Sequence, residues 1–315
     1  MRVAVSYLQN SMNTKPSVSF VIPAFNASLT LKDAVTSIFA GNFSDGDEVI
    51  IVNDASTDST SIVIQELVET FAPHIYSITN DHNKGCPATR NVGIQTAKNT
   101  LIFNLDADNI LAPGSVRMLV NALISQAADM AAFSEYHYFI DSTKRITHYW
   151  YCIPGWLSLE NFMAGHINPG PGGNFLYTKA SWEQIGGYSE YGKGLHEAWG
   201  FTLKQLASGS KVFVVPDTFY FHRHGHESLF TTESRNKPGE RELLQKMIAD
   251  SSQLFPEEEI TYMANHDWYH QLEIRPIRLF SNKVGKNGLM RYSLYGYWRK
   301  IVQKLRALLL QIVPR

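Results

Sequence analysis

Short apolar runs alternate with helical patterns through the first hundred residues of the 315-residue chain. Continuously apolar runs predict strands that are covered on both faces, and apolar residues three or four positions apart predict the covering helices. This alternation predicts an α/β fold with a mostly parallel sheet flanked by helices. The predicted strands are 18–22, 48–52, 75–78 and 101–105, and the predicted helices are 29–39, a segment after the 53–58 turn that reaches about 71, and 87–97.

The pattern becomes looser after residue 105, although single elements can still be predicted from it. The segment 149–173 is rich in Trp, Tyr, Gly and Pro. Irregular segments that follow an ordered α/β half often carry the binding residues, so we expect a substrate site there. The further predicted elements are helices at 113–125 and 235–252 and strands at 130–138 and 212–215.

The composition excludes a disordered or fibrous chain, because 44% of the residues are apolar and 12% are aromatic. Cys86 and Cys152 are the two cysteines, which gives no disulfide framework and indicates two buried thiols in a reducing compartment. Residues 1–17 show no secretory signal, and no apolar run has the length needed to span a bilayer. We therefore expect a cytoplasmic protein.

Two carboxylates follow the apolar strand 101–105. Asp106 and Asp108 are expected at the carboxyl end of a buried strand, where open α/β sheets bind ligands. Carboxylate oxygens are hard ligands that suit Mg²⁺ or Mn²⁺ already carrying phosphate oxygens. The alternative is a solvated loop that happens to contain two acidic residues.

Several short motifs occur in a fixed order along the chain. They are Val21-Ile22-Pro23-Ala24-Phe25-Asn26, Val52-Asn53-Asp54-Ala55-Ser56-Thr57-Asp58, Asn83-Lys84-Gly85 with Ala88-Thr89-Arg90-Asn91-Val92-Gly93, Asp106-Ala107-Asp108, Gly172-Gly173-Asn174-Phe175-Leu176 and Ile185-Gly186-Gly187-Tyr188. In order and in spacing they resemble family 2 glycosyltransferases, over about Ser17 to Ser228. The resemblance implies a GT-A fold and inverting transfer of a sugar from a nucleotide-sugar donor, with a UDP-sugar expected.

We expect three regions in the chain, and the resemblance implies a donor site in the second of them. The regions are an N-terminal extension (1–16), a GT-A glycosyltransferase domain (17–230) and a helical C-terminal region with a basic amphipathic tail (231–315). Asp54 would accept a hydrogen bond from the donor's base, or would cap the next helix. Arg90 would meet phosphate or base oxygens, or would form a salt bridge on the helix surface. The implied donor-binding residues are Pro23, Ala24, Asn26, Asp54, Lys84, Arg90 and Asp106.

An inverting transfer needs a carboxylate that takes the proton of the acceptor hydroxyl. The segment 196–209, which begins His-Glu-Ala-Trp, resembles the family's Glu-Asp-Trp segment with its later arginine and glycine. Ala198 replaces the second acidic residue, and Lys204 replaces the arginine. Glu197 is then the implied catalytic base, with His196 as a weaker substitute. The alternative for Glu197 is an acidic residue that the helix dipole favours at a helix start.

The acceptor and the metal have candidate ligands by the same resemblance. The acceptor is expected to contact Gly173, Asn174 and Trp199, although a tryptophan beside a glycine-rich loop is as often plain packing. Residues 220–228 contain three histidines at alternate positions. A third metal ligand would come from His222 or His224 in addition to Asp106 and Asp108, and imidazole would favour Mn²⁺ over Mg²⁺. Ordinary loop histidines are the alternative, and no cysteine pattern indicates zinc.

Charge is unevenly distributed along the chain. Ten basic residues and no acidic residue follow Glu273, so 274–315 carries +10 and, with a net charge of −1 for the chain, residues 1–273 carry −11. Apolar residues recur at helical spacing within this tail, and the basic residues lie largely elsewhere around the helix. Such a helix is attracted to an anionic membrane surface, so peripheral attachment to the inner face of the plasma membrane is one hypothesis. Packing of the apolar side on the catalytic domain is the other.

The sequence therefore predicts a glycosyltransferase that depends on Mn²⁺ or Mg²⁺. Its expected acceptor is a hydroxyl of a glycan or lipid-linked molecule in cell-envelope polysaccharide synthesis, and no nucleic acid partner is expected. A non-catalytic nucleotide-sugar or glycan binder is an alternative that Ala198 favours. A nucleotidyltransferase is a weaker alternative, since 23–26 lacks a glycine-rich loop ending in Arg and Lys.

Overall fold

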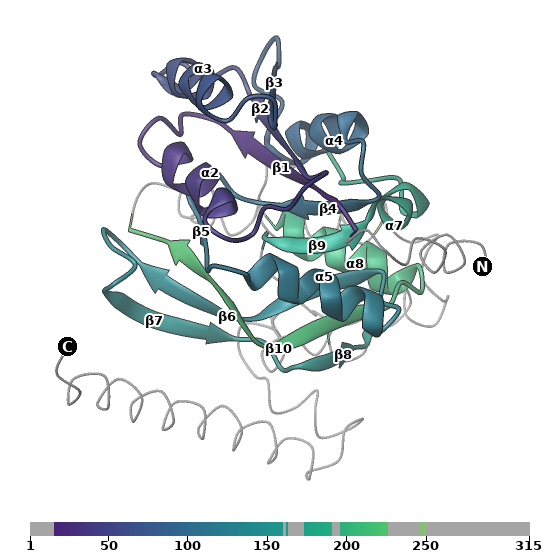
Figure 1. Cartoon of the computed structure of the whole chain (residues 1–315). Coiled ribbons are helices and arrows are strands. Elements are labelled where there is room, and N and C mark those ends of the chain that lie inside the picture. Colours follow the sequence, from purple (N-terminus) through teal and green to yellow (C-terminus); the bar gives the residue numbers. More distant parts are fainter. Residues whose placement is uncertain are drawn as a thin grey trace, which may run out of the picture.

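A computed structural model describes residues 16–159, 162, 173–190, 196–225, 246 and 249. Within these residues ten strands form one sheet, in the order β3-β2-β1-β4-β9-β6-β10-β5, with β7 beside β6 and β8 beside β10. Helices lie on both sides of the sheet (Figure 1). The structure thus confirms the α/β class that the hydrophobic pattern predicted.

The first half of the sheet is parallel. Each pairing among its four strands is parallel, and the connecting helices lie between them in the chain. Every residue of the second and fourth strands is buried, which explains why these segments are apolar without alternation. The elements are β1 (Val18–Ala24), α2 (Leu31–Phe39), β2 (Glu48–Asn53), α3 (Thr60–Thr70), β3 (Ile75–Thr79), α4 (Cys86–Thr96) and β4 (Leu101–Asn104).

The second half of the sheet is mixed, so the predicted parallel arrangement holds only as far as β4. The strand β9 is antiparallel to both β4 and β6, whereas β6 and β10 are parallel to each other. The short strands β5, β7 and β8 are all antiparallel to their partners. The bounds are β5 (Ile110–Leu111), β6 (Met130–Phe139), β7 (Ile146–Tyr151), β8 (Gly155–Leu157), β9 (Phe175–Thr178) and β10 (Val212–Arg223).

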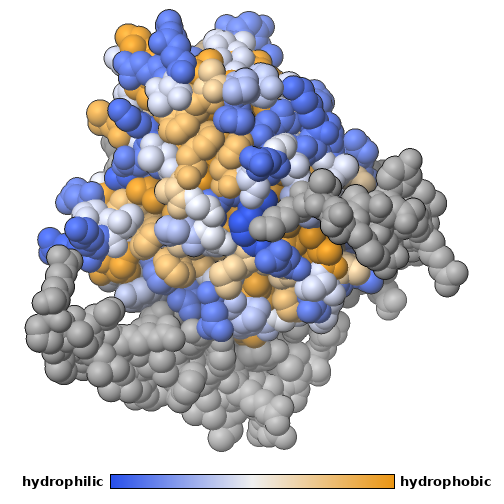
Figure 2. All heavy atoms as spheres, in the orientation of Figure 1, coloured by the Kyte–Doolittle hydropathy of each residue, from blue (hydrophilic) through white to orange (hydrophobic). Residues whose placement is uncertain are grey.

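Two apolar layers hold the helices on the sheet. One contains the buried faces of α2, α3 and α5 (Ser115–Ser125), and the other contains those of α4, α7 (Lys179–Gln184) and α8 (Glu197–Ala207). Only Thr60, Ile64 and Leu67 are buried in α3. In the upper part of the molecule, where α3 and β3 lie, Figure 2 shows hydrophilic residues along the outer edges and apolar residues between them. One-sided burial is the reason that the helical spacing was readable in the sequence.

β1 continues through Pro23, where the sequence suggested that it would stop. Proline lacks the N–H that a central strand donates to a neighbour. The pairing of β1 with β4 ends at Val21, so Pro23 is paired with Val52 of β2 alone. The missing donor therefore costs no ladder hydrogen bond to β4.

Several predicted segments lie outside the described residues. These include nearly all of the N-terminal extension, the basic tail 274–315 and the helix 235–252, apart from Lys246 and Ala249, which are both helical. The irregular segment 149–173 is described at 149–159, 162 and 173, and it contains the end of β7 and the whole of β8. No helix in the described part of the chain is long and apolar enough to cross a membrane.

Candidate active site

The candidate site lies at the carboxyl edge of the parallel half of the sheet. β1, β2 and β4 end side by side. Asp54 follows β2 directly, and Asp106 follows β4 after one residue. Asn26 and Ala55, in the loops that leave β1 and β2, have positive φ angles of 50° and 54°. Strained backbone of this kind, in a residue such as alanine, is concentrated at functional sites.

Asp54 is buried and anchors the turn that precedes α4. Its carboxylate accepts hydrogen bonds from the backbone N–H groups of Lys84 and Gly85, both at 2.9 Å, and from the Asn80 amide at 2.7 Å. The alternative that Asp54 caps the next helix is wrong. Asp58 performs that task, because its Oδ1 accepts from the backbone N–H of Thr60, the first residue of α3.

Hydrogen bonds join the loops that leave β1 and β2. The Asn26 side-chain oxygen accepts from the backbone N–H of Thr57 at 2.9 Å, and the backbone N–H of Asn26 donates to the Ser56 hydroxyl at 3.0 Å. Burial differs among the expected donor residues in this region: Ala24 is fully buried, Pro23 is half-buried, and Asn26 and Lys84 are exposed. The Lys84 ammonium pairs with Asp81 at 3.1 Å.

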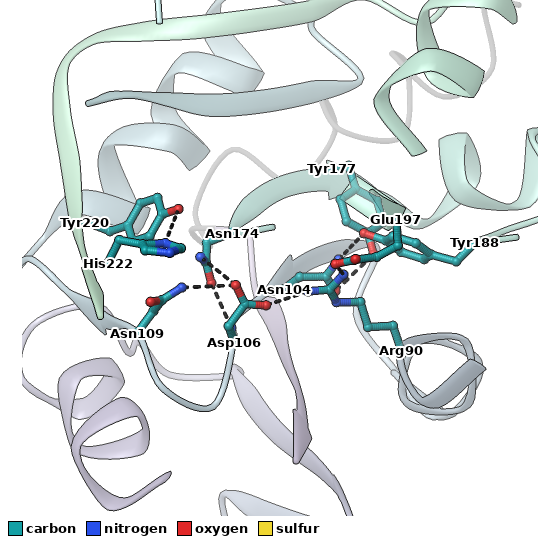
Figure 3. A network of polar contacts seen from close by, with 10 residues as sticks. All are labelled: Arg90, Asn104, Asp106, Asn109, Asn174, Tyr177, Tyr188, Glu197, Tyr220 and His222. Atoms are coloured by element: carbon teal, nitrogen blue, oxygen red, sulfur yellow. Dashed lines mark hydrogen bonds and ion pairs between the residues drawn. The ribbon is translucent and has the colours of Figure 1, made fainter. Parts of the chain in front are cut away.

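Asp106 lies at the centre of a polar network whose residues come from different parts of the chain (Figure 3). Its Oδ1 accepts from Arg90 of α4 at 2.5 Å. Its Oδ2 accepts from the side-chain amides of Asn109 at 3.0 Å and Asn174 at 3.1 Å. Asn174 also accepts from the backbone N–H of Asp106 at 2.7 Å, so its side-chain amide forms two hydrogen bonds with this residue. The Asp106 carboxylate is therefore held in one orientation.

The resemblance implied that Gly173 and Asn174 contact an acceptor, and the structure places both against Asp106. Asn174 is 1% exposed, and its amide is directed at Asp106. At Gly173 a β-carbon would lie 2.9 Å from Oδ2 of Asp106 and 3.1 Å from Nη2 of Arg90. A glycine is needed at this position because the backbone passes so close to the carboxylate.

Arg90 connects this network to the candidate base. Its Nη1 donates to Oε1 of Glu197, the first residue of α8, at 2.5 Å, while Nη2 donates to Asp106. The arginine is 1% exposed, and its guanidinium lies 5.4 Å from the centre of the Tyr188 ring. The salt bridge foreseen on the helix surface is thus a buried one. It brings together two carboxylates that are far apart in the sequence.

The environment of Glu197 changes its proton affinity. Burial raises the pKa of this carboxyl above its usual value, and the neighbouring Arg90 guanidinium opposes the rise. Only 14% of the Glu197 side chain is exposed. Burial by itself would lower the pKa of Arg90, but the attraction of the surrounding negative groups raises it well above its usual value. The arginine therefore stays charged beside Glu197.

A second buried network supports the glycine turn before α8. The Asn91 amide oxygen accepts from the backbone N–H of Tyr188 at 2.9 Å and from the Trp182 indole at 3.1 Å. Lys204, which replaces the family's arginine, donates to the carbonyl of Gly187 at 2.7 Å. A β-carbon at Gly187 would lie 2.9 Å from the Asn91 amide oxygen. This packing explains the Gly-Gly-aromatic sequence at 186–188.

Asp108 lies in the turn between β4 and β5, beside the end of β10. Arg223 donates from Nε to the Asp108 carbonyl at 3.1 Å, and its backbone N–H donates to the Asn109 side chain at 3.0 Å. His222 precedes Arg223 on the same strand, and its neighbour Phe221 pairs with Ile110. The predicted loop at 220–223 is therefore strand, and it brings His222 to the Asp106–Asp108 turn.

The donor set fits a divalent metal that is bound together with a diphosphate. No three His, Cys, Asp or Glu side chains among the described residues converge in a way that would hold an ion on their own. Both oxygens of Asp106 already accept hydrogen bonds, and Nδ1 of His222 lies 3.4 Å from the Tyr220 hydroxyl. Mg²⁺ and similar ions are usually held by one or two carboxylates, with substrate phosphates completing the shell.

The remaining candidate residues, His224 and Trp199, contact aromatic residues. His224 Nε2 is 2.7 Å from the Thr147 hydroxyl of β7, and its ring is edge-on to Tyr138. Trp199 is half-buried, and its ring stacks on Phe162 at 5.5 Å. Cys86 and Cys152 are free thiols; Cys152 is buried as predicted, whereas Cys86 is half-buried.

Comparison with known proteins identifies the family. The family model for glycosyl transferase family 2 matches residues 19–186, which contain β1 to β9 and the Asp106 network. The chain belongs to glycosyl transferase family 2. Enzymes of this family generally depend on a divalent metal.

Relatives of this chain include a succinoglycan biosynthesis protein and a beta-1,3-glucosyltransferase. The succinoglycan biosynthesis protein ExoO of Rhizobium meliloti is 30% identical over 116 residues, which is 37% of this chain and 32% of that protein. The GalNAc(5)-diNAcBac-PP-undecaprenol beta-1,3-glucosyltransferase of Campylobacter jejuni is 30% identical over 105 residues, or 33% of this chain and 34% of that enzyme. The matched part thus spans about a third of the length of these relatives.

Solved structures show the same fold. Residues 1–349 of S. aureus TarS, in complex with UDP-GlcNAc, superpose with a TM-score of 0.61 at 15% identity, covering 88% of this chain and 78% of that one. At this identity the likeness concerns the fold, which is the GT-A fold of these glycosyltransferases.

Three supporting residues were not singled out as site residues in the sequence. Asn109, Arg223 and Tyr188 all contact the network, through Asp106, the Asp108 carbonyl and the Arg90 guanidinium respectively. Asn109 and Tyr188 stand within or beside the motifs, which is the signal that could have found them. Arg223 lies in the 220–228 stretch that was singled out for its histidines, but its contact with Asp108 depends on the pairing of β10 with β5.

Proposed function

We propose that this protein is a metal-dependent inverting glycosyltransferase that moves a sugar from a nucleotide-sugar donor, a UDP-sugar, to a hydroxyl of a glycan or lipid-linked acceptor. The observation that carries the proposal is the pair of carboxylates, Asp106 on the donor side and Glu197 on α8, held together by one buried arginine. One relative is a succinoglycan biosynthesis protein and another is named for an undecaprenol-linked substrate, which favours an acceptor in cell-envelope polysaccharide synthesis.

The donor is proposed to lie along the carboxyl ends of β1, β2 and β4. Pro23, Ala24 and Asn26 would line the base and ribose, with Asp54 and Lys84 at the turn before α4. This placement is supported by the topology, since ligands of open α/β sheets bind outside the carboxyl ends of the strands. Asp106, oriented by its neighbours, would face the ribose.

A divalent metal, Mn²⁺ or Mg²⁺, is proposed to be held by Asp108 and His222. Asp106 and His224 are further candidate ligands. Such an ion supplies positive charge that stabilises a departing diphosphate. An imidazole ligand favours Mn²⁺. The Asp106–Asn109 turn is held in place for this role by Arg223 and Asn174.

Glu197 is proposed as the base that takes the proton of the acceptor hydroxyl. Its neighbour Ala198 can take no proton, and Glu197 is the carboxylate of α8 that the structure ties to the Asp106 network. Because burial raises the pKa of Glu197, the carboxylate is lost on acidification at a higher pH than an ordinary glutamate would lose it. We therefore expect transfer to decline as the pH falls toward this raised pKa. Gly173 and Trp199 remain the proposed acceptor-side residues.

The direct test is release of UDP from a panel of UDP-sugars by the full-length protein with Mn²⁺. Glu197→Gln is expected to lower turnover by about 10² or more, because general bases contribute about 10²–10⁴ to the rate. The acid limb of the pH profile should disappear in this variant. Glu183→Gln, at an exposed position on α7, is the matched control and should behave as the parent protein. Undiminished turnover in Glu197→Gln would refute the assignment of the base.

A non-catalytic nucleotide-sugar or glycan binder is the second candidate function. The observation in its favour is Ala198, which stands where the family's second acidic residue would be. Binding of UDP with Mn²⁺ by the parent protein, without turnover of any donor in the panel, would support this candidate over the enzyme.

The basic tail 274–315 is proposed to attach the enzyme to an anionic membrane surface, on the inner face of the plasma membrane. The support is its charge of +10 and the apolar residues at helical spacing within it. Lipid-linked acceptors would be found at this surface.

A further inference from the structure

The role of Arg90 differs from the one that its sequence position suggested. Both terminal nitrogens of its guanidinium are used within the protein, Nη1 on Glu197 and Nη2 on Asp106, each at 2.5 Å. The side chain is 1% exposed. Each terminal nitrogen keeps a second N–H, but burial leaves little of the guanidinium open to a phosphate or a base.

The surroundings of Arg90 favour a fixed position. Residues from three other elements or loops enclose the guanidinium: Asp106 after β4, Glu197 on α8 and Tyr188 in the turn after α7. Its Nε is buried and has no hydrogen-bond partner among the described residues. A buried donor left unsatisfied costs free energy. The two charge-assisted hydrogen bonds, which are stronger than neutral ones, offset this cost and hold the side chain in place.

The arrangement fixes the spacing between the two carboxylates. Arginine presents its N–H groups in a rigid planar fork, so two carboxylates bound to its two terminal nitrogens are held a set distance apart. One belongs to the donor side of the site, and the other is the proposed base. The charge of Arg90 also favours the ionised form of Glu197 against the effect of burial.

We propose that Arg90 is a positioning residue that holds Glu197 in register with Asp106, and that it does not bind the donor. The inference rests on the proposed function, since it assumes that Glu197 is the base. It follows that Arg90 acts on turnover through Glu197, while the affinity for the nucleotide depends on other residues. Lysine cannot replace it fully, because a single ammonium lacks the planar fork that bridges both carboxylates.

The test compares Arg90→Lys, Arg90→Gln and Glu197→Gln in the full-length protein. For the UDP-sugar that the parent turns over fastest, we expect kcat to fall by about 10² in Arg90→Gln and by less in Arg90→Lys, because misplacement of a catalytic group by about 1 Å costs rates of this order. KM for the donor should change less than about threefold. The double variant Arg90→Gln, Glu197→Gln should be within about threefold of Glu197→Gln alone, since residues that act as a unit are not additive.

Binding of UDP with Mn²⁺, measured by calorimetry, supplies a readout that needs no turnover. The dissociation constant should stay within about threefold of the parent in Arg90→Lys. A rise of tenfold or more, or additive losses of kcat in the double variant, would overturn the proposal and make Arg90 a donor ligand. If the parent binds UDP without turning over any donor, the proposed function fails while this binding measurement still decides whether Arg90 is a ligand.

Arg117→Lys is the control for a loss of folding. Arg117 forms a similar pair with the buried Asp47 at 2.6 Å, near α5 and away from the site. This variant should lose thermal stability to a similar extent as Arg90→Lys and keep the parent's kcat. Equal losses of kcat in both lysine variants would attribute the effect to stability and contradict the positioning role.

Discussion

At Gly173 the backbone passes so close to Asp106 and Arg90 that a side chain does not fit. The contact lies where the candidate base and the donor side meet, so a small displacement is transmitted to both. A single added methyl group at Gly173 would therefore disturb the site directly.

We predict that Gly173→Ala lowers turnover by about 10² without unfolding the protein, because the added methyl group displaces the Asp106 carboxylate from its place. Turnover of a UDP-sugar and the thermal midpoint are the two measurements. Gly114→Ala is the control: its φ is +74° but nothing lies within 4 Å of a β-carbon there, so this variant should lose stability and keep turnover. Parent-like turnover in Gly173→Ala would show that the close approach has no bearing on catalysis.

Arg90 and Asn174 show the limit of reading single residues from a sequence. The motifs located both residues correctly at the site, because motif spacing reflects which strand ends are adjacent. The direction of each side chain could not be read, since it depends on partners such as Glu197 that are distant in the chain. Burial then decided the outcome: a charged or amide group without access to solvent must bond to the protein.

Elements in the parallel half were predictable, and those in the mixed half were less so. α2 has a clear helical period and β2 is a continuous apolar run, and the structure places both within two residues of the predicted bounds. β7, β8 and β9 were not predicted, because they are short, and β8 and β9 pair with strands far away in the sequence. The extension of β10 to Arg223 was missed for a similar reason, as an irregularity separates Val215 from Phe219.

The basic tail 274–315 is predicted to bind anionic membranes. Deletion of residues 286–315 should abolish co-sedimentation with liposomes that contain anionic lipid, since each basic residue near such a surface contributes about 1 kcal/mol. Liposomes of neutral lipid should bind neither form. A full-length variant with Arg299→Glu and Lys300→Glu keeps the length and reverses two charges, and it should bind more weakly than the parent. Unchanged sedimentation of the deletion variant would refute membrane attachment through the tail.

At the scale of the whole molecule, the parallel half of the sheet supplies the donor side and α8 supplies the candidate base. β4 and β9 are paired, so Asp106 at the end of one strand meets Gly173 and Asn174 just before the other. α4 spans the two parts through Arg90. The membership in glycosyl transferase family 2 and the GT-A fold agree with this division.

The central claim is that this site binds a nucleotide diphosphate together with a divalent metal. The most direct measurement is the thermal midpoint of the full-length protein with UDP, GDP, dTDP or CMP, each with Mn²⁺, Mg²⁺ or EDTA, because a ligand that binds the native state raises apparent stability. We predict a rise with UDP and Mn²⁺ that is lost in EDTA and in Asp108→Ala. No rise with any nucleotide, or a rise with UDP that survives both EDTA and Asp108→Ala, would contradict it.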